Sequence, residues 1–115
     1  MPFSIKRVYD PPAPDDGHRI LVDRLWPRGF TKARAKVDEW LKEIAPSTEL
    51  RRWFHADTSR WSEFRSRYRH ELSENADAVA HVRALARTGR VTLLYGARDP
   101  EHNHAVVLME YLKRK

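Results

Sequence analysis

Residues 91–112 read VTLLYGARDPEHNHAVVLMEYL, and this stretch decides the predicted fold. Its first five residues, Val91–Tyr95, form a mostly apolar run typical of a strand buried on both faces. After Gly96, the pair Asp99 and Pro100 predicts a helix start, because aspartate caps helices and proline suits the first helical position. The core face of that helix is expected from Ala105, Leu108, Met109 and Leu112. A buried strand that leads through a short loop into a helix is typical of α/β proteins.

Two more strands are predicted near the N-terminus. Residues 3–9 partly alternate apolar and polar side chains, the period of a half-buried strand. Residues 19–26 carry a continuous apolar centre, which predicts a strand covered on both faces, and Pro27 and Gly29 end it. Between the two strands, residues 10–17 contain three prolines and predict a surface loop.

Three helices are predicted in the middle of the chain. The first begins at residues 47–48, where serine and threonine can cap it, and the second begins at residues 58–59 for the same reason. The third spans residues 76–88, and Gly89 is expected to end it in a left-handed conformation. Residues 37–44 fit either a short helix or an extended segment.

The second of these helices has a clear amphipathic pattern. Apolar side chains recur three and four residues apart at Trp61, Phe64, Tyr68 and Leu72. On another face, Glu63 is expected to pair with Arg67, and Arg67 with Glu71. The pattern predicts a helix with one buried face and a salt-bridged exterior.

The order of these elements predicts an α/β fold with a small, mostly parallel sheet of three to four strands flanked by helices. The 115 residues fit a single domain spanning 1–115, because two separate cores would each be too small. No apolar run approaches the roughly 18 to 20 residues that cross a bilayer, and the N-terminus lacks the apolar core of a signal peptide. The absence of cysteine excludes disulfides and a cysteine nucleophile and fits a reducing compartment, so we expect a cytoplasmic protein.

The charge is basic, with 22 Lys and Arg against 16 Asp and Glu, a formal net charge of +6. Such an excess favours contact with nucleic acid but does not define an activity. The densest basic stretch lies in the predicted helices between Arg51 and Arg69. These arginines either line one face and follow phosphates or are neutralised by acidic neighbours one helical turn away.

The segment after the second predicted strand is Asp23-Arg24-Leu25-Trp26-Pro27-Arg28-Gly29. Arginine suits bidentate capture of phosphate or carboxylate, and tryptophan stacks on rings. Because ligands of open α/β sheets gather beyond the carboxyl ends of the strands, Arg24, Trp26 and Arg28 are predicted to bind a ligand. A structural explanation is equally good: Trp26 closes the core, and Asp23 pairs with a neighbouring arginine.

The second candidate segment, Tyr95–His104, joins the last predicted strand to the last helix. Free backbone N–H groups and the positive end of a helix dipole at this edge favour an anion, and Arg98 adds charge. One glycine is present, and no Walker or dinucleotide fingerprint is found. Asp99 fits a helix cap better than a catalytic group. The predicted ligand-binding residues of this segment are Tyr95, Arg98, Asn103 and His104.

No metal site and no cofactor are predicted. On one helix, His102 and His104 would point about 200° apart and could not chelate one ion together. No His-Glu-x-x-His pattern is present. His55 and Asp57 could form an oriented imidazole, but Asp57 lies between two predicted helices and is better explained as a turn or cap residue.

Four segments carry a family resemblance. They read RVYD at residues 7–10, LVDRLWPRG at 21–29, WFH at 53–55 and TLLYGARD at 92–99. Over nearly its whole length the chain resembles the YeaO-like branch of the bacterial domain of unknown function 488 family. The resemblance implies an α/β fold and names no reaction, because the family's function is uncharacterised.

Broader relatives in that family have an Asp-Val-Arg-x-x-Pro-Arg pattern and a Cys-His-Arg triplet. The chain matches the first in part, because Asp23 and Arg24 are adjacent here. At the triplet it has Asn103, His104 and Ala105, so the thiol and the guanidinium are missing. The resemblance therefore implies a site at the same two strand ends, without the chemistry of that thiol.

The sequence hypothesis is binding of a phosphorylated or nucleotide-like small anion at the carboxyl ends of the strands. Hydrolysis would extend the hypothesis, with Asp23 or Asp99 as the catalytic acid–base group, and whether the chain is an enzyme stays open. The alternative is a nucleic-acid-binding module that uses the arginine-rich helices. A third hypothesis is a protein-interaction domain with no ligand.

Overall fold

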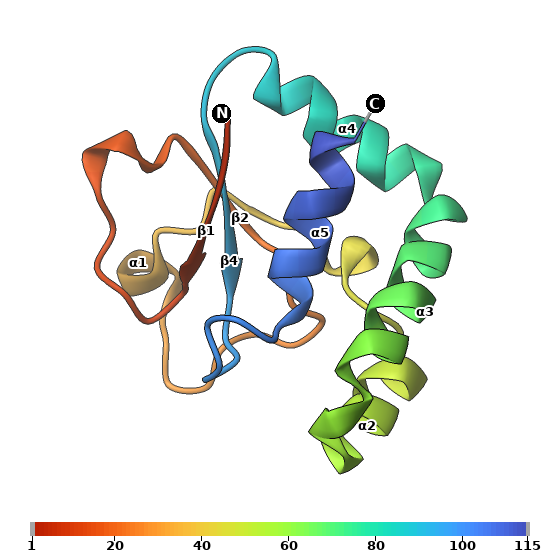
Figure 1. Cartoon of the computed structure of the whole chain (residues 1–115). Helices are drawn as coiled ribbons and strands as arrows, with labels where there is room; N and C mark the ends of the chain where they lie inside the picture. Colours follow the sequence, from red (N-terminus) through yellow and green to blue (C-terminus); the bar gives the residue numbers. More distant parts are fainter. Residues whose placement is uncertain (1, 115) are drawn as a thin grey trace.

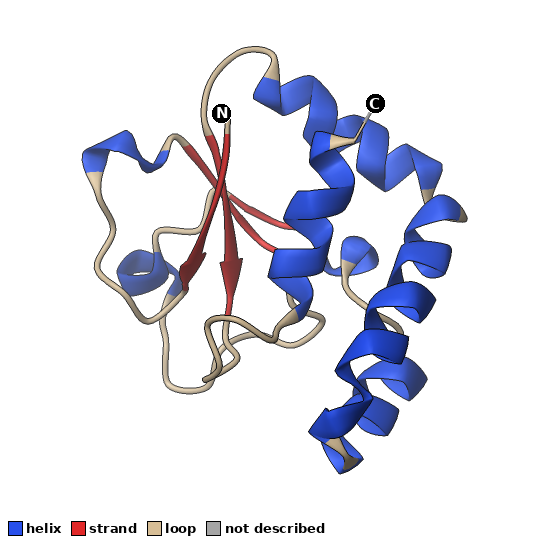
Figure 2. Cartoon of the chain, viewed as in Figure 1, coloured by secondary structure: helices blue, strands red, loops and turns tan. Residues whose placement is uncertain are grey.

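The computed structural model describes residues 2–114 and confirms the α/β class. Its centre is a four-stranded sheet in the order β1-β4-β2-β3, and every strand pair is parallel. The strands are β1 (Phe3–Arg7), β2 (His18–Leu21), β3 (Glu39–Trp40) and β4 (Val91–Tyr95), drawn red in Figure 2. All five residues of β4 are buried between its neighbours and the two covering layers, as the apolar run predicts.

Four helices cover one side of the sheet (Figure 1). They are α2 (Thr48–Ala56), α3 (Trp61–Ser73), α4 (Ala76–Ala86) and α5 (His104–Lys113). The main core lies between them and the sheet, where Ile20 and Leu93 meet helix residues such as Tyr68 and Leu108. The predicted apolar faces of α3 and α5 therefore point inward.

The opposite face of the sheet has a thinner cover. The short helix α1 (Lys32–Ala35) and the segment before β2 lie there (Figure 1). A second apolar cluster of Val8, Leu21, Ala35 and Leu94 fills this side near the carboxyl ends of the strands. Buried faces on both sides explain why β2 and β4 read as continuous apolar runs.

On the sheet face covered by α1, a buried cluster of charged side chains lies toward the amino ends of the strands, and the sequence analysis did not predict it. Asp16, in the predicted surface loop, is only 6% exposed and accepts hydrogen bonds from Lys6 (2.8 Å) and Arg19. Burial alone would raise the pKa of the Asp16 carboxyl, but hydrogen bonds from Lys6, the Ala13 N–H and Arg19 outweigh burial and hold its pKa below the ordinary value. Part of the proline-rich segment is therefore tied into the sheet.

The predicted start of α2 is confirmed. Ser47 caps it, because its Oγ accepts from the Leu50 N–H at 3.2 Å. Asp57 also has the predicted structural role, since its Oδ1 accepts from the N–H of Ser59 at 3.1 Å and starts a short 3-10 turn before α3.

One of the two ion pairs predicted on α3 forms. Glu63 pairs with Arg67, but the predicted Arg67–Glu71 pair is wrong. Glu71 instead accepts hydrogen bonds from the backbone N–H (2.9 Å) and Oγ (2.6 Å) of Ser47. These bonds fix the end of α3 against the start of α2, a contact between helices that spacing within one helix cannot reveal.

The structure decides one open prediction and corrects two others. Residues 37–44 contain the two-residue strand β3 and a 3-10 turn at Lys42–Ile44. Gly89 is not left-handed: among the described glycines, Gly17 and Gly29 have positive φ. Helix α5 begins at His104 rather than near Pro100, because Asn103 supplies the cap and its Oδ1 accepts from the Val106 N–H at 3.1 Å.

Candidate functional site

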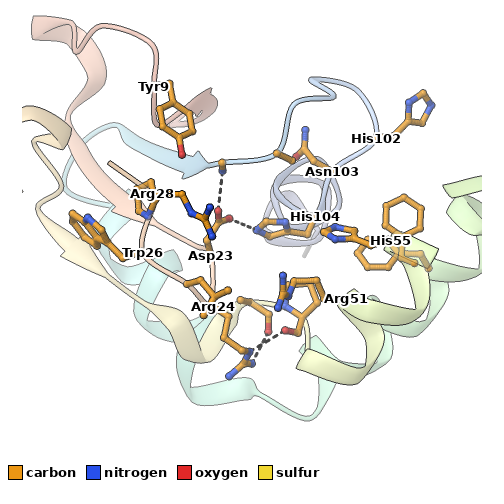
Figure 3. Close-up of a pocket in the computed structure, with 18 residues that line it drawn as sticks. Tyr9, Asp23, Arg24, Trp26, Arg28, Arg51, His55, His102, Asn103 and His104 are labelled. Atoms are coloured by element: carbon orange, nitrogen blue, oxygen red, sulfur yellow. Dashed lines mark hydrogen bonds and ion pairs between the residues drawn. The ribbon is translucent and has the colours of Figure 1, made fainter. Parts of the chain in front are cut away.

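A cavity of about 300 Å³ lies at the carboxyl ends of β2 and β4 (Figure 3). Its walls come from the segment after β2, the loop after β4, the start of α5 and one side of α2. Of the nine residues that the sequence analysis named for the site, six line this cavity: Asp23, Arg24, Trp26, Arg28, Asn103 and His104. The fold thus brings together two segments that lie more than 60 positions apart in the chain.

Asp23 sits at the centre of the site and joins the two strand ends. Its Oδ2 accepts a hydrogen bond from the Gly96 N–H at 2.8 Å. The Nε2 atom of His104 lies 2.9 Å from Asp23 Oδ1 and 3.1 Å from the Val22 carbonyl oxygen. One N–H of His104 therefore faces two acceptors, and Oδ1 keeps no well-aligned hydrogen bond of its own.

Two of the predicted ligand-binding residues have structural contacts instead of free polar groups. Arg24 donates from Nε to the Pro46 carbonyl (3.1 Å) and from Nη2 to the Ala45 carbonyl (3.2 Å). Trp26 donates from Nε1 to the Phe30 carbonyl at 2.6 Å. Both side chains line the cavity, but the Arg24 Nε and Nη2 groups and the indole N–H already have partners.

Two other arginines face the cavity without a carboxylate partner among the described residues. Arg28 is exposed and reaches the cavity from the same loop as Asp23 (Figure 3). Arg51 comes from α2, and its Nε is enclosed with no hydrogen-bond acceptor. An enclosed guanidinium N–H without an acceptor is costly, and an anion in the cavity would relieve that cost.

His55 lies one helical turn after Arg51 on α2 and faces the same cavity. Burial lowers the pKa of His55 below its ordinary value, and the nearby positive charges of Arg51 and His104 lower the pKa further. The lowered pKa favours the neutral form of the His55 imidazole over its protonated form.

Part of the cavity wall is apolar. Phe54 and Phe64 stack there with ring centroids 4.5 Å apart, and Tyr9 lies at another part of the rim. Phe54 and Phe64 are only 5% and 2% exposed, so Tyr9, at 38%, supplies the accessible aromatic side chain beside the guanidinium groups.

Asn103 has a structural role at the cavity wall. It is 2% exposed, and besides capping α5 it donates from Nδ2 to the Asp99 carbonyl at 2.8 Å. Its position places the N-terminus of α5, with His104, against the cavity.

Three predicted site residues do not line the cavity. Tyr95 is 3% exposed within the core, and burial, followed by the charge of Asp10, raises the pKa of its hydroxyl. Arg98 is exposed outside it. Asp99 accepts from the N–H groups of Glu101 (2.9 Å) and His102 (3.1 Å), and these bonds, with the His102 side chain, lower its pKa.

Sequence reasoning missed Arg51 and His55 as residues of the site. It counted Arg51 among the helical arginines, and it considered His55 together with Asp57 and within the family segment at residues 53–55 without assigning it to the site. Their four-residue spacing was the available signal, because it places both side chains on one face of α2. Which face meets the cavity depends on how α2 packs, and the sequence does not reveal this.

Among residues 2–114, no group of three or more histidine or acidic side chains could hold a metal ion. Within the same residues, no helix is both long and apolar enough to cross a membrane.

A comparison with known protein families tests the resemblance that the four sequence segments indicated. A family profile described as "Inactive DUF488-N3 subclade" matches residues 2–115. The chain belongs to this DUF488 subclade. The family predicted from the sequence is thus confirmed, and it gives this DUF488 member no established reaction.

Curated relatives of this DUF488 chain are similar over nearly their whole length. The chain is 46% identical to the uncharacterized protein YeaO of Escherichia coli over 113 residues, which cover 98% of both proteins. It is 44% identical to the uncharacterized protein Rv3073c of Mycobacterium tuberculosis over 108 residues, which cover 94% of this chain and 91% of the relative. No solved structure matches the chain significantly.

Proposed function

We propose that this chain binds a small phosphorylated or nucleotide-like anion in the cavity between β2, β4 and α2. The observation that carries the proposal is the charge balance of the cavity wall. Asp23, the one carboxylate among the described lining residues, already contacts Gly96 and His104, whereas Arg28 and Arg51 have no carboxylate partner. The cavity therefore holds uncompensated positive charge in a partly enclosed place, where charge-assisted hydrogen bonds are strongest.

The size and the apolar wall favour a mononucleotide or a compound of similar size. A cavity of about 300 Å³ is at the lower end for small-molecule sites and excludes large cofactors. Tyr9, which is 38% exposed at the rim, offers an aromatic surface for a base or another flat group. The guanidinium groups of Arg28 and Arg51 would hold the phosphate.

We propose binding without turnover. Both oxygens of Asp23 lie against groups that hold the two strand ends together, so this carboxylate is a poor general base. Asp99, the other predicted acid–base group, lies outside the cavity lining and is occupied by its own loop. The description of the subclade as inactive agrees with a binding role.

The proposal is tested by calorimetric titration of the purified chain with inorganic phosphate, adenosine monophosphate and ribose 5-phosphate. We expect Arg51→Ala and Arg28→Ala each to weaken binding about tenfold, because each removes hydrogen bonds to a charged group. Arg52→Ala is the matched control, since Arg52 is exposed, neighbours Arg51 on α2 and does not line the cavity. Equal affinity in all three variants, or no binding by the wild-type chain, would refute the site.

A further inference from the structure

Two pairs of aromatic side chains, here called the aromatic strip, lie at one side of the cavity, and Tyr9 and Trp26 also line the cavity. Tyr9 and Phe30 have ring centroids 4.8 Å apart, and Trp26 and Trp40 have ring centroids 5.4 Å apart. The hydrogen bond from Trp26 Nε1 to the Phe30 carbonyl joins the two pairs. Tyr9 is 38% exposed and Trp40 is 37% exposed, so the two ends of this aromatic strip are open to solvent.

Positively charged side chains lie on three of these rings. The guanidinium of Arg7 is 5.1 Å from the centre of Tyr9, and that of Arg34 is 5.0 Å from Phe30. The Lys42 ammonium is 4.9 Å from Trp40. Among the described residues, none of these three cations forms an ion pair with a carboxylate. Arg7 has one hydrogen bond, from Nε to the Ala97 carbonyl.

The helical arginines are different. Three of those on and next to α3 pair with carboxylates: Arg60 with Asp57, Arg65 with Glu110 and Arg67 with Glu63. Their positive charge is largely neutralised within the molecule. Among the described residues, Arg52 and Arg69 of these helices form no such pair. Free positive charge also lies along the aromatic strip, and the exposed residues Lys32 in α1 and Lys36 at its C-cap add to the charge of that segment. Two exposed acidic residues also lie near the strip: Asp10 follows Tyr9 in the chain, and Glu43 follows Lys42. The net charge of the strip is therefore positive, although negative side chains interrupt it.

We propose that the aromatic strip and its three cations, Arg7, Arg34 and Lys42, bind single-stranded nucleic acid. Alternating rings and unpaired cations suit this ligand, because unpaired bases stack on aromatic side chains while phosphates contact the cations. An exposed cation–π contact is weak, so a base displaces the cation from the ring at little cost and the cation turns to the phosphate. A duplex lacks free base faces and fits the strip poorly. The surface differs from the arginine-rich helices that the sequence analysis named for its alternative hypothesis, a nucleic-acid-binding module.

Fluorescence anisotropy with labelled oligo(U) and oligo(dT), each about 12 nucleotides long, tests this proposal. Both probes are expected to bind at low salt, with an affinity that falls steeply as salt rises. The double variant Arg34→Ala/Lys42→Ala removes two exposed cations of the strip. It is expected to weaken binding at least about tenfold and to reduce the slope of log affinity against log salt by about 1.4, because each contact with a single strand contributes about 0.7.

The matched control is Arg52→Ala/Arg67→Ala, which removes the same charge from α2 and α3. It is expected to change the affinity by less than about twofold, because neither side chain belongs to the strip. The proposed small-anion site is tested separately, by Arg28→Ala and Arg51→Ala with small phosphates. An abasic oligomer of equal length should bind at least about fivefold more weakly.

Several results would overturn the proposal. The first is that the wild-type chain binds neither oligonucleotide at low salt. The second is that the strip variant and its control lose the same affinity. The third is that the abasic oligomer binds as tightly as the oligomer with bases. Equal affinity for a polyglutamate peptide of the same charge would assign the strip to acidic proteins instead.

Discussion

At the scale of single residues, Asp23 holds the candidate site together. Its carboxylate contacts the Gly96 N–H after β4 and the His104 imidazole at the start of α5, and its carbonyl accepts from Trp40 Nε1 at 2.8 Å. A Cβ on Gly96 would lie 3.0 Å from Asp23 Oδ2, so glycine permits this close approach. Asp23 therefore positions the ends of the strands, which explains the presence of an acidic residue in a cavity that we propose to bind anions.

His55 gives the site a dependence on pH. The pKa of His55 is lower in the folded chain than in the unfolded chain, where it is about 6.5. Below that value the unfolded chain takes up the proton first, so the His55 contribution to stability falls as the pH drops through about 6.5 toward the folded pKa. Protonation also adds positive charge beside Arg51, so anion binding tightens over the same range.

Sulfate is the suitable probe, because its charge is constant over this range. We expect its affinity to rise as the pH falls from about 7 to 5 in the wild-type chain, and this rise to shrink in His55→Gln. His70→Gln is the control, since His70 is exposed on α3 outside the cavity. A rise that is the same in all three proteins would show that His55 does not contribute.

At the scale of elements, the sequence predicts what depends on neighbouring residues. The start of α2 at Ser47 and the buried strand β4 are local patterns, and both are confirmed. The start of α5 was misplaced because Asp99 and Asn103 both satisfy the same local rule; Asp99 caps a turn in the loop, and Asn103 caps the helix. Strand β3 has two residues and exists through its pairing with β2, which no local pattern reveals.

The turn before β2 is an element that only glycine can form without strain. Gly17 has φ +70°, and a Cβ there would lie 2.1 Å from the Arg90 carbonyl oxygen. Gly17→Ala combines this collision with an unfavourable conformation, so we expect a loss of at least about 3 kcal/mol in the free energy of unfolding. Chemical denaturation measures this loss.

Gly29→Ala is the matched control for that substitution. Gly29 also has a positive φ, +79°, but nothing lies within 4 Å of a Cβ there. The free energy of unfolding of Gly29→Ala should fall only by the conformational cost of the positive φ, about 1–2 kcal/mol. Similar losses in the two variants would contradict the role given to the Arg90 carbonyl.

At the scale of the whole molecule, the structure separates two kinds of positive charge. Three arginines on and beside α3 pair with carboxylates such as Glu63, whereas those at the strand ends and along the aromatic strip do not. The net charge of +6 therefore says little until the fold shows where the charge is uncompensated.

The candidate site could be predicted only in part, because some of its residues follow from position along the chain and others depend on the fold. Residues at the ends of β2 and β4 follow from a general rule for α/β sheets, so Asp23, Arg28 and His104 could be named from the sequence. Arg51 and His55 enter the site through the packing of α2, which is held against α3 by the bonds between Ser47 and Glu71. Contacts of this long-range kind have no signature in the spacing of residues along one helix.

The central claim, a small anion bound between the two strand ends, is tested most directly by nuclear magnetic resonance. The measurement is a titration of the ¹⁵N-labelled chain with adenosine monophosphate, followed by the backbone amide signals and the indole signal of Trp26. Saturable shifts centred on Gly96, His104 and Arg51, weakened in Arg51→Ala, are the predicted result. Shifts confined to the outer face of α3, or no saturable shifts at all, would contradict the account.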